Sequence, residues 1–405
     1  MRILIHTMYY LPEPGSAPIL MDELAASMAA RGHAVEIITT IPRPPHNRGY
    51  EGRFFVRERR SGFLVKRIIT NFTAHHFGRL LAWSIYTLYT FWNLRTVRRG
   101  DIVFLRLPPL QLGVTGWLAR RWRGAKVILN VQDIHPDLSI ESGLLRNRLA
   151  IKAALSFEKW IYDRNPQIVV ISDGFKANLL RKGVPPAKVA VIPNWVDTDF
   201  LRPHPKDNPV SVRLGLADKF VVMYSGIISI SSYETLVRVL EAARLLSDDP
   251  RIRVVLVGEG FKGKDLKSKA EALGARNVIL WPFQPYADLP FLLAAADGLF
   301  VPLDKAKSLL SVPSKLYNYL AAGRPILALA TEASEVHRLI RDVGCGICAS
   351  PEDPSAIASA VRRLADSAEE RTAMGLRSRA FVEEHYARDR VLDAFEALMT
   401  RMART

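Results

Sequence analysis

Residues 311–330 read SVPSKLYNYLAAGRPILALA and join a loop, a helix and a strand. The Ser-Val-Pro-Ser-Lys run favours a loop that opens a helix, the helix ends near Gly323, and an apolar strand follows. A helix N-terminus carries partial positive charge, so Ser311, Ser314 and Lys315 together favour an anionic ligand at this position. The alternative is a plain capped helix with a lysine that faces solvent.

The same alternation of helix and strand extends along the whole chain. Short β-branched apolar runs alternate with helical segments, and the runs lack the polar alternation of a half-exposed strand. Such runs are typical of parallel strands that are buried on both faces. The pattern occurs twice, which predicts an α/β fold of two Rossmann-like, doubly wound parallel-sheet domains. The ligand is then expected in a central cleft, at the carboxyl ends of the strands.

Composition agrees with a two-domain globular protein. The chain has 405 residues, of which 49% are hydrophobic and 24% charged, a balance that excludes extended disorder. Its two cysteines, Cys345 and Cys348, are too few for a disulfide framework and fit a reducing cytosol. The N-terminal run MRILIHTMYYLPEPG is typical of a first strand and its loop rather than of a signal peptide.

The net charge of +16 is concentrated in the N-terminal half. Residues 43–67 carry eight Lys/Arg against two Glu, and residues 95–126 carry eight against one Asp. Between them lies the apolar run LLAWSIYTLYTFW at 80–92, which is shorter than the ~20 residues that span a bilayer. This run suits either an anionic membrane interface or a core helix with a solvated basic rim. No groove-reading or base-stacking motif accompanies the charge, which argues against nucleic acid.

Eight short motifs follow one another in a characteristic order. They are PEPG, VQDIHPD, ISDG, VIPNWVD, YSG, LVGEG, PFQP and VPSKLYNYLAAGRPIL. In this order the chain resembles glycosyltransferase family 4, whose members are retaining enzymes of the GT-B fold. Within that family it is most similar to the bacterial branch that builds capsule, colanic-acid or O-antigen polysaccharide.

The resemblance refines the expected domains. We expect an N-terminal acceptor-side domain over 1–201, a linker over the Pro-rich segment 202–219, and a nucleotide-sugar-binding domain over 220–385. Residues 386–405 carry an apolar stripe, and in GT-B enzymes the last helix returns to the N-terminal domain.

The donor site follows from the residues and from the resemblance together. A nucleotide-sugar diphosphate carries about two negative charges, and Lys315 supplies a counter-charge while glycines let the backbone approach. The resemblance implies that Phe283 holds the nucleobase, that Asn318 bonds the ribose in place of a usual glutamate, and that Glu335 bonds the sugar or nucleotide. The expected donor-binding residues are Gly15, Gly226, Gly258, Glu259, Phe283, Ser311, Ser314, Lys315, Asn318 and Glu335. Lys305 and Lys307 are further candidates for the counter-charge.

The segment VQDIHPD supplies the expected catalytic residues. Many relatives have His-Asp where this chain has Gln132 and Asp133, so their role in orienting the donor sugar is carried over to these two positions. His135 is an additional candidate from this sequence. An Asp after a strand is alternatively a simple helix cap.

The resemblance therefore implies a retaining, metal-independent glycosyltransferase, and we expect no cofactor. Its donor would be a nucleotide sugar, UDP-linked, and its acceptor a lipid-diphosphate-linked saccharide or other glycan. We expect it in the cytoplasm, bound peripherally to the anionic inner face of the plasma membrane. The alternatives are a UDP-sugar 2-epimerase of the GT-B fold and a non-catalytic nucleotide-sugar-binding protein. An NAD enzyme is disfavoured, because no G-x-G-x-x-G follows either first strand.

Overall fold

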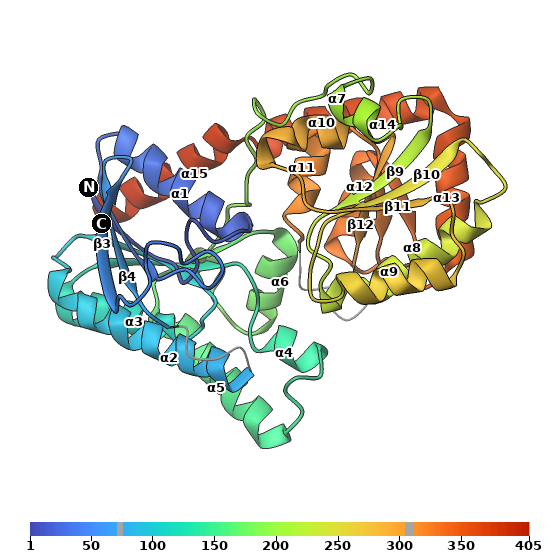
Figure 1. The fold of residues 1–405 in the computed structure, drawn as a ribbon. Coiled ribbons are helices and arrows are strands. Elements are labelled where there is room, and N and C mark those ends of the chain that lie inside the picture. Colours follow the sequence, from blue (N-terminus) through green and yellow to red (C-terminus); the bar gives the residue numbers. More distant parts are fainter. Residues whose placement is uncertain (71–75, 304–311, 405) are drawn as a thin grey trace. The chain divides into compact units, whose positions relative to one another are not determined.

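The chain forms two compact units, each built on a mainly parallel sheet. The computed structural model describes residues 1–70, 76–303 and 312–404. Unit 1 comprises Met1–Asn194 and Asp389–Thr405, and unit 2 comprises Trp195–Arg388 (Figure 1). Both units have the doubly wound α/β architecture that the sequence predicts.

Unit 1 contains an eight-stranded sheet in the order β3-β4-β2-β1-β5-β6-β7-β8 within the described residues. Its central strands are buried apolar runs, as the lack of polar alternation predicted. The strands are β1 (Arg2–His6), β2 (Ala34–Thr40), β3 (Phe55–Arg60), β4 (Phe63–Ile68), β5 (Ile102–Leu107), β6 (Lys126–Val131), β7 (Gln167–Val170) and β8 (Val189–Val191).

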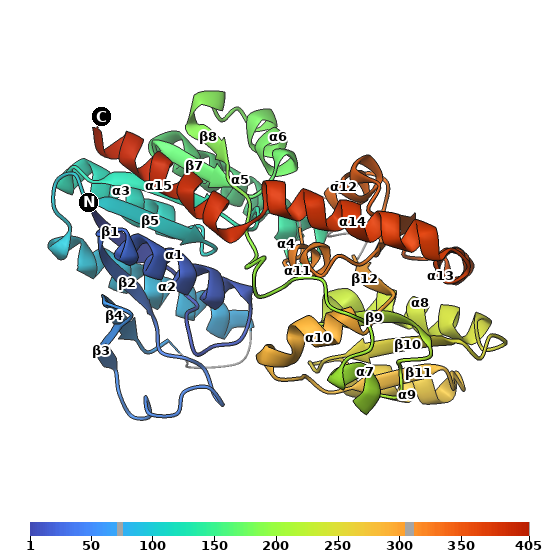
Figure 2. The same ribbon diagram turned by 90° about the horizontal axis from the view of Figure 1, so that it is seen from above.

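Helices cover both faces of this sheet. On one face lie α1 (Ser16–Ala30) and α15 (Arg388–Arg404), and α15 packs Phe395 edge-on against Phe104 of β5 at 5.7 Å (Figures 1 and 2). On the other face lie α2 (His76–Asn93), α3 (Leu112–Arg123) and α5 (Arg148–Arg164). The Tyr86 hydroxyl of α2 donates to the Ile38 carbonyl of β2 at 2.7 Å and anchors that helix. The shorter helices are α4 (Asp137–Glu141) and α6 (Asp173–Arg181).

Two glycines let α3 pack closely between its neighbours. A Cβ at Gly113 would lie 2.3 Å from Cγ2 of Ile161 on α5, and a Cβ at Gly116 would lie 2.7 Å from Cδ1 of Leu105 on β5. Any larger residue would push these elements apart. The packing makes α2, α3 and α5 one continuous layer.

The antiparallel strand β3 is a difference from the expected all-parallel sheet. It pairs with β4 across a turn in which Ser61 and Gly62 have φ of 47° and 87°. Because β3 is an exposed edge strand rich in arginine, it lacks the apolar run that marks the buried strands. The Ser-Gly pair between two strand-forming runs is the signal that indicates this hairpin.

Unit 2 contains a six-stranded parallel sheet in the order β11-β10-β9-β12-β13-β14 within the described residues. Its strands are β9 (Phe220–Ser225), β10 (Ile252–Val257), β11 (Val278–Trp281), β12 (Gly298–Pro302), β13 (Ile326–Leu329) and β14 (Gly346–Ala349). Its helices are α7 (Pro209–Arg213), α8 (Ile230–Leu245), α9 (Gly263–Ala272), α10 (Leu289–Ala294), α11 (Lys315–Ala321), α12 (Glu335–Val343), α13 (Pro354–Asp366) and α14 (Ala368–His385).

Residues 202–219, for which the sequence predicts a linker, lie within unit 2. The Asn208 side chain accepts from the N–H groups of Val210 and Ser211 and starts α7, whose Val210 is buried. An Asn followed by Pro is a helix N-cap followed by an N1 proline, which a Pro-rich composition conceals. The last helix, α15, begins at Arg388 and lies in unit 1 from Asp389 onward.

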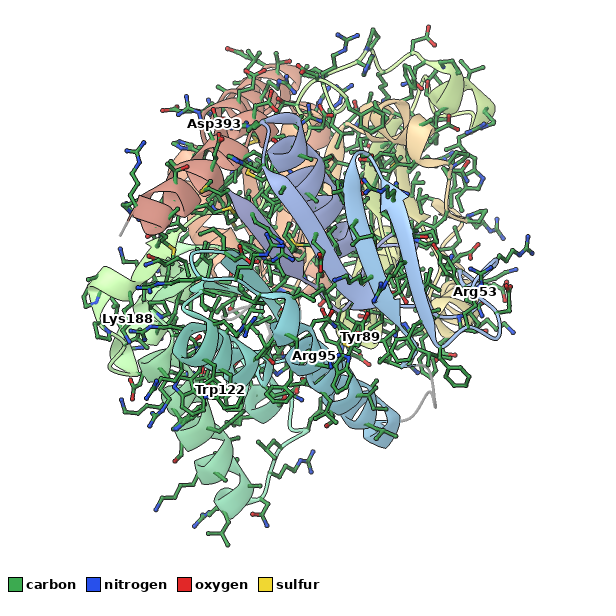
Figure 3. The ribbon with its side chains drawn as sticks, turned by 90° about the vertical axis from the view of Figure 1, so that its left-hand side faces the viewer. Arg53, Tyr89, Arg95, Trp122, Lys188 and Asp393 are labelled. Carbon is green, nitrogen blue, oxygen red and sulfur yellow. The ribbon has the colours of Figure 1, made fainter. Side chains whose placement is uncertain are left out.

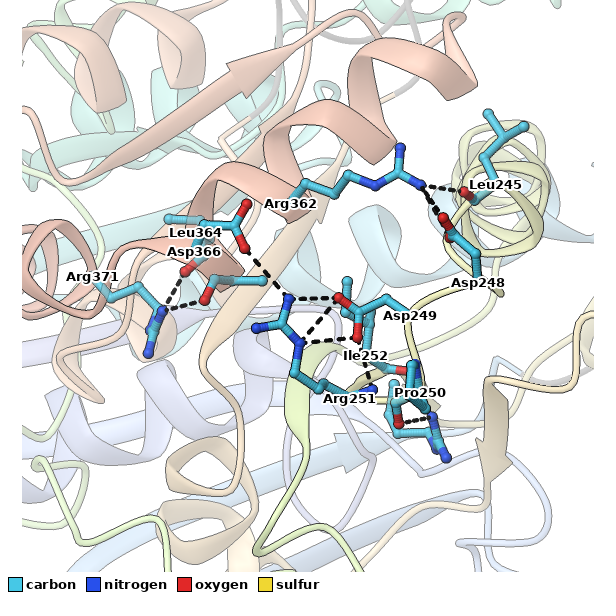
Figure 4. A network of polar contacts seen from close by, with 12 residues as sticks. Leu245, Asp248, Asp249, Pro250, Arg251, Ile252, Arg362, Leu364, Asp366 and Arg371 are labelled. Atoms are coloured by element: carbon cyan, nitrogen blue, oxygen red, sulfur yellow. Dashed lines mark hydrogen bonds and ion pairs between the residues drawn. The ribbon is translucent and has the colours of Figure 1, made fainter.

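A polar network closes unit 2 at the loop that precedes β10. Arg251 pairs with Asp249 at 2.6 Å, and Arg362 of α13 donates to the Leu245 carbonyl at 2.8 Å and to Asp248 at 3.1 Å (Figure 4). These contacts tie α13 to the end of α8. They lie at the amino end of β10, which leaves the carboxyl edge of the sheet for function.

Candidate active site

Two glycines form a tight turn pair at the carboxyl edge of the unit 2 sheet. Gly226 follows β9 with φ +153°, and Gly258 follows β10 with φ +143°. A Cβ at Gly258 would lie 2.0 Å from the Gly226 carbonyl oxygen, so only glycine fits there. The Gly226 N–H donates to the Val257 carbonyl at 2.9 Å and joins the two turns.

Lys315, the first residue of α11, brings a cation to this glycine pair. Its Nζ lies 2.8 Å from the position that a Cβ on Gly226 would occupy, and 3.8 Å from the centroid of the Tyr224 ring. Burial lowers the pKa of the Lys315 ammonium to about 7. Among the described residues, no carboxylate pairs with it. A buried cation without a counter-charge is costly, and a bound anion would remove that cost.

Two tyrosines that the sequence analysis missed hold this arrangement in place. The Tyr319 hydroxyl accepts from the Ser225 N–H at 2.8 Å and donates to the Ser225 carbonyl at 3.0 Å. It therefore fastens α11 to the end of β9. The Tyr224 hydroxyl donates to the Ile227 carbonyl at 2.7 Å, which fixes the ring beneath Lys315. The signal for Tyr319 is its position four residues after Lys315, on the same side of the helix.

Ser314 and Asn318 lie on either side of Lys315, near the start of α11. Ser314 occupies the N-cap position of α11, one residue before the helix begins, and its hydroxyl caps no backbone N–H of the helix. Asn318 lies one turn after Lys315 and is half-buried. Ser311, Lys305 and Lys307 lie outside the described residues.

Three other expected donor residues lie along the same edge of the sheet. Glu259 is exposed beside Gly258, and its carbonyl accepts from the Ile228 N–H at 2.9 Å. Phe283 follows β11 and is 48% exposed, and Glu335 starts α12 after β13. The strand order places β11 and β13 on opposite sides of β9, so Phe283 and Glu335 belong to opposite sides of the Lys315 centre.

In unit 1, Gln132 is held at both ends of its amide. Its Nε2 donates to Oδ1 of the buried Asn130 at 2.7 Å, and its Oε1 accepts from Nδ2 of Asn194 at 2.8 Å. Gln132 thus joins the end of β6 to the segment that follows β8. Both ends of the Gln132 amide are therefore engaged in hydrogen bonds within unit 1.

Asp133 and His135 lie at the same carboxyl edge of unit 1. Asp133 interacts electrostatically with Arg106 of β5, and burial lowers the pKa of the Arg106 guanidinium to about 10 while Asp133 opposes that shift. The buried Nε of Arg106 has no hydrogen-bond partner among the described residues. His135 Nδ1 lies 3.2 Å from Ser139 Oγ, and its ring meets Trp83 of α2 edge-on at 6.0 Å.

Gly15 and Asp137 also belong to sequence motifs of unit 1. Gly15 is the exposed N-cap residue of α1 with φ +123°. Asp137, the last residue of the segment VQDIHPD, accepts from Lys182 at 2.6 Å and from Asn178 at 3.0 Å. Asp137 is therefore occupied by structural contacts.

Sequence reasoning also missed the buried polar residues behind the expected catalytic segment. Arg106 and Asn130 are polar residues within otherwise apolar strands, and Asn194 ends the motif VIPN. A buried polar side chain needs a partner, so each such interruption of an apolar run indicates a site or a network.

Comparison with known proteins agrees with this architecture. Residues 19–195 match the model of the glycosyl transferase 4-like domain, and residues 214–381 match the model of the glycosyl transferases group 1. With two parallel-sheet units, these matches define a glycosyltransferase of the GT-B fold. The chain belongs to glycosyltransferase family 4.

Individual relatives cover nearly the whole chain. WcaI of Escherichia coli K12, described as a colanic acid biosynthesis glycosyl transferase, is 28% identical over 90% of this chain and 92% of its own length. The structure of sucrose-phosphate synthase from Thermosynechococcus elongatus matches with a TM-score of 0.77 at 16% identity, over 99% of this chain and 98% of that chain. HepE of Anabaena in complex with UDP-glucose matches with a TM-score of 0.72 at 15% identity, over 99% and 100%.

Proposed function

We propose that this glycosyltransferase transfers a hexosyl or N-acetylhexosaminyl group from a UDP-sugar to a lipid-diphosphate-linked saccharide in cell-surface polysaccharide synthesis. The observation that carries the proposal is the ammonium of Lys315, which lies against Gly226 with no carboxylate partner among the described residues. A diphosphate carries about two negative charges and needs such a cation as it leaves.

The choice of a UDP-linked donor is supported by a protein of the same fold. The HepE structure contains UDP-glucose. At 15% sequence identity, its likeness to this chain shows a shared fold. In this chain we propose that Phe283 holds the nucleobase and that Asn318 hydrogen-bonds a ribose hydroxyl. Glu335 would hydrogen-bond the sugar or the nucleotide. Gly258, Glu259, Ser311 and Ser314 complete the proposed donor site, and Gly15 is assigned to the donor phosphate or the acceptor sugar.

The proposed chemistry is retaining and needs no metal ion. The bond from the anomeric carbon to the diphosphate breaks, the acceptor hydroxyl forms the new bond on the same face, and the leaving diphosphate takes the acceptor proton. Lys315 stabilises the negative charge on the leaving group. We assign Asp133 to orienting the donor sugar, with Arg106 holding its carboxylate and Gln132 fixing the segment. His135, held by Ser139, is assigned to the acceptor hydroxyl.

A lipid-linked acceptor also requires a position at a membrane. We therefore propose that the enzyme works in the cytoplasm, at the anionic inner face of the plasma membrane. The basic N-terminal half supports this location, because anionic lipids attract clustered Lys and Arg.

The test is a transfer assay with UDP-, GDP- and ADP-sugars and lipid-linked saccharide acceptors. We expect UDP release coupled to acceptor extension, with retention at the anomeric carbon and full activity in EDTA. Asp133→Asn is expected to lower kcat at least tenfold while UDP affinity is unchanged. UDP release without acceptor extension, or epimerisation of the sugar, would contradict the proposal.

A further inference from the structure

Helix α2 has one face that its own unit does not cover. Leu81, Leu88, Phe91 and Trp92 are exposed, whereas Tyr86, Thr90 and Asn93 are buried on the opposite side of the helix. The exposed residues recur at helical spacing and form one apolar stripe. No helix among the described residues is long and apolar enough to cross a membrane.

The stripe continues onto two neighbouring elements. Trp122 of α3 meets Phe91 edge-on at 6.0 Å, and Phe55 of the edge strand β3 lies 5.9 Å from Tyr89 of α2. We call the exposed set Phe55, Leu88, Phe91, Trp92 and Trp122 the aromatic face. Four of these side chains are more than 60% exposed, and Phe91 is 40% exposed. An exposed apolar surface of this extent marks an interaction site.

Arginines surround the aromatic face, and they come from both basic stretches of the sequence. The Arg95 guanidinium lies 3.4 Å from the centroid of the Trp92 ring. Arg57 and Arg59 are exposed and share the face of β3 that carries Phe55, because they follow it at alternate positions. Figure 3 views this side of the molecule, with Tyr89, Arg95 and Trp122 labelled. Residues 76–100 and 112–124 contain no Asp or Glu.

We propose that the aromatic face binds an anionic lipid surface, with α2 lying in the plane of the interface. Tryptophan and arginine beside each other place apolar rings among lipid chains and charge among the headgroups. A second copy of this chain fits poorly, because a two-fold interface would bring these arginines against one another.

The inferred surface is connected to the site of unit 1 through α2 itself. Trp83, nearer the start of the helix, packs against His135, while Trp92 lies near its end. If the proposed function holds, a lipid-linked acceptor would lie in the same leaflet that α2 contacts. The binding of vesicles needs neither donor nor acceptor, so it is tested separately.

The experiment is vesicle flotation of the full chain, without donor or acceptor. Vesicles of equal parts phosphatidylcholine and phosphatidylglycerol are compared with phosphatidylcholine alone. We expect binding to the anionic vesicles only, weakened by salt. Leu88→Ser and Trp92→Ser should each weaken binding about tenfold, and Arg57→Gln or Arg59→Gln about fivefold each. The matched control is Leu376→Ser on α14, because Leu88 and Leu376 are both 67% exposed.

Three results would overturn the proposal. The first is that the unchanged protein does not bind anionic vesicles. The second is that Leu88→Ser and Leu376→Ser weaken vesicle binding equally. The third is that the protein binds no vesicles but forms a dimer that Leu88→Ser dissociates. Circular dichroism and UDP calorimetry on each variant separate these results from misfolding. Vesicle binding without UDP binding would contradict the proposed donor site alone, and UDP binding without vesicle binding would contradict only the aromatic face.

Discussion

At the scale of single residues, Lys315 is the group on which the donor site depends. Burial lowers its pKa to about 7 from the ordinary 10.5. Between these two values the folded protein binds fewer protons than the unfolded chain, so this group's contribution to the unfolding free energy rises with pH. Below pH 7 the buried ammonium costs stability unless an anion accompanies it.

The lowered pKa predicts proton uptake when UDP binds. The diphosphate favours the ammonium, so at pH 8 binding should take up nearly one proton, and UDP affinity should fall as pH rises above about 7. Calorimetry in two buffers of different ionisation enthalpy measures the uptake. Lys315→Ala should abolish it, whereas Lys219→Ala, at the amino end of β9, should retain it. Equal proton uptake in the two variants would show that a group other than Lys315 binds the proton.

The glycine pair gives a second prediction at this scale. Gly258→Ala adds a clash with the Gly226 carbonyl to the strain of positive φ, whereas Gly183→Ala, with φ +84° and open space around the Cβ, adds strain alone. We expect Gly183→Ala to lower the unfolding free energy by about 1 kcal/mol and Gly258→Ala by about 3 kcal/mol. Urea unfolding of the two variants is the measurement, and equal losses would refute the tight turn.

At the scale of elements, the contact between α11 and β9 sets the position of Lys315. Tyr319→Phe removes both hydrogen bonds to Ser225 and deprives the Ser225 N–H of this acceptor. We expect a loss of about 1–3 kcal/mol in unfolding free energy and weaker UDP binding, both measured on the same protein. Tyr224→Phe keeps the aromatic ring beneath Lys315 and should weaken UDP binding less than Tyr319→Phe does. Similar UDP affinities in unchanged protein and Tyr319→Phe would show that α11 needs no such anchor.

The elements also show where sequence reasoning succeeded. Buried parallel strands were predicted because their apolar runs are continuous. The glycine turns at Gly226 and Gly258 and the helix start near Lys315 were predicted because such turns and helix starts have local signals. Strand β3 and helix α7 were missed because exposed or Pro-rich composition conceals them. Tyr319, Arg106 and Asn194 gain their roles through partners distant in sequence, such as Tyr319 with Ser225, and local pattern does not indicate such pairs.

At the scale of the whole molecule, the two units should respond separately to heat and to ligand. Phe395→Ala removes the contact of α15 with Phe104 and should destabilise unit 1 by about 3–5 kcal/mol. UDP at about 100 times its Kd should stabilise unit 2 by about 2.7 kcal/mol. Scanning calorimetry should therefore show two transitions, one lowered by Phe395→Ala and the other raised by UDP. If both changes moved the same transition, the donor site would not belong to unit 2 alone.

The most direct test of the donor site is titration calorimetry with UDP, GDP and ADP. We predict that UDP binds the unchanged protein and that Lys315→Ala weakens its binding by about tenfold or more, since a charged hydrogen bond contributes about 1.5–3 kcal/mol. The absence of binding by all three nucleotides, or equal UDP affinity in Lys315→Ala, would contradict a donor site built on Lys315 and the two glycines.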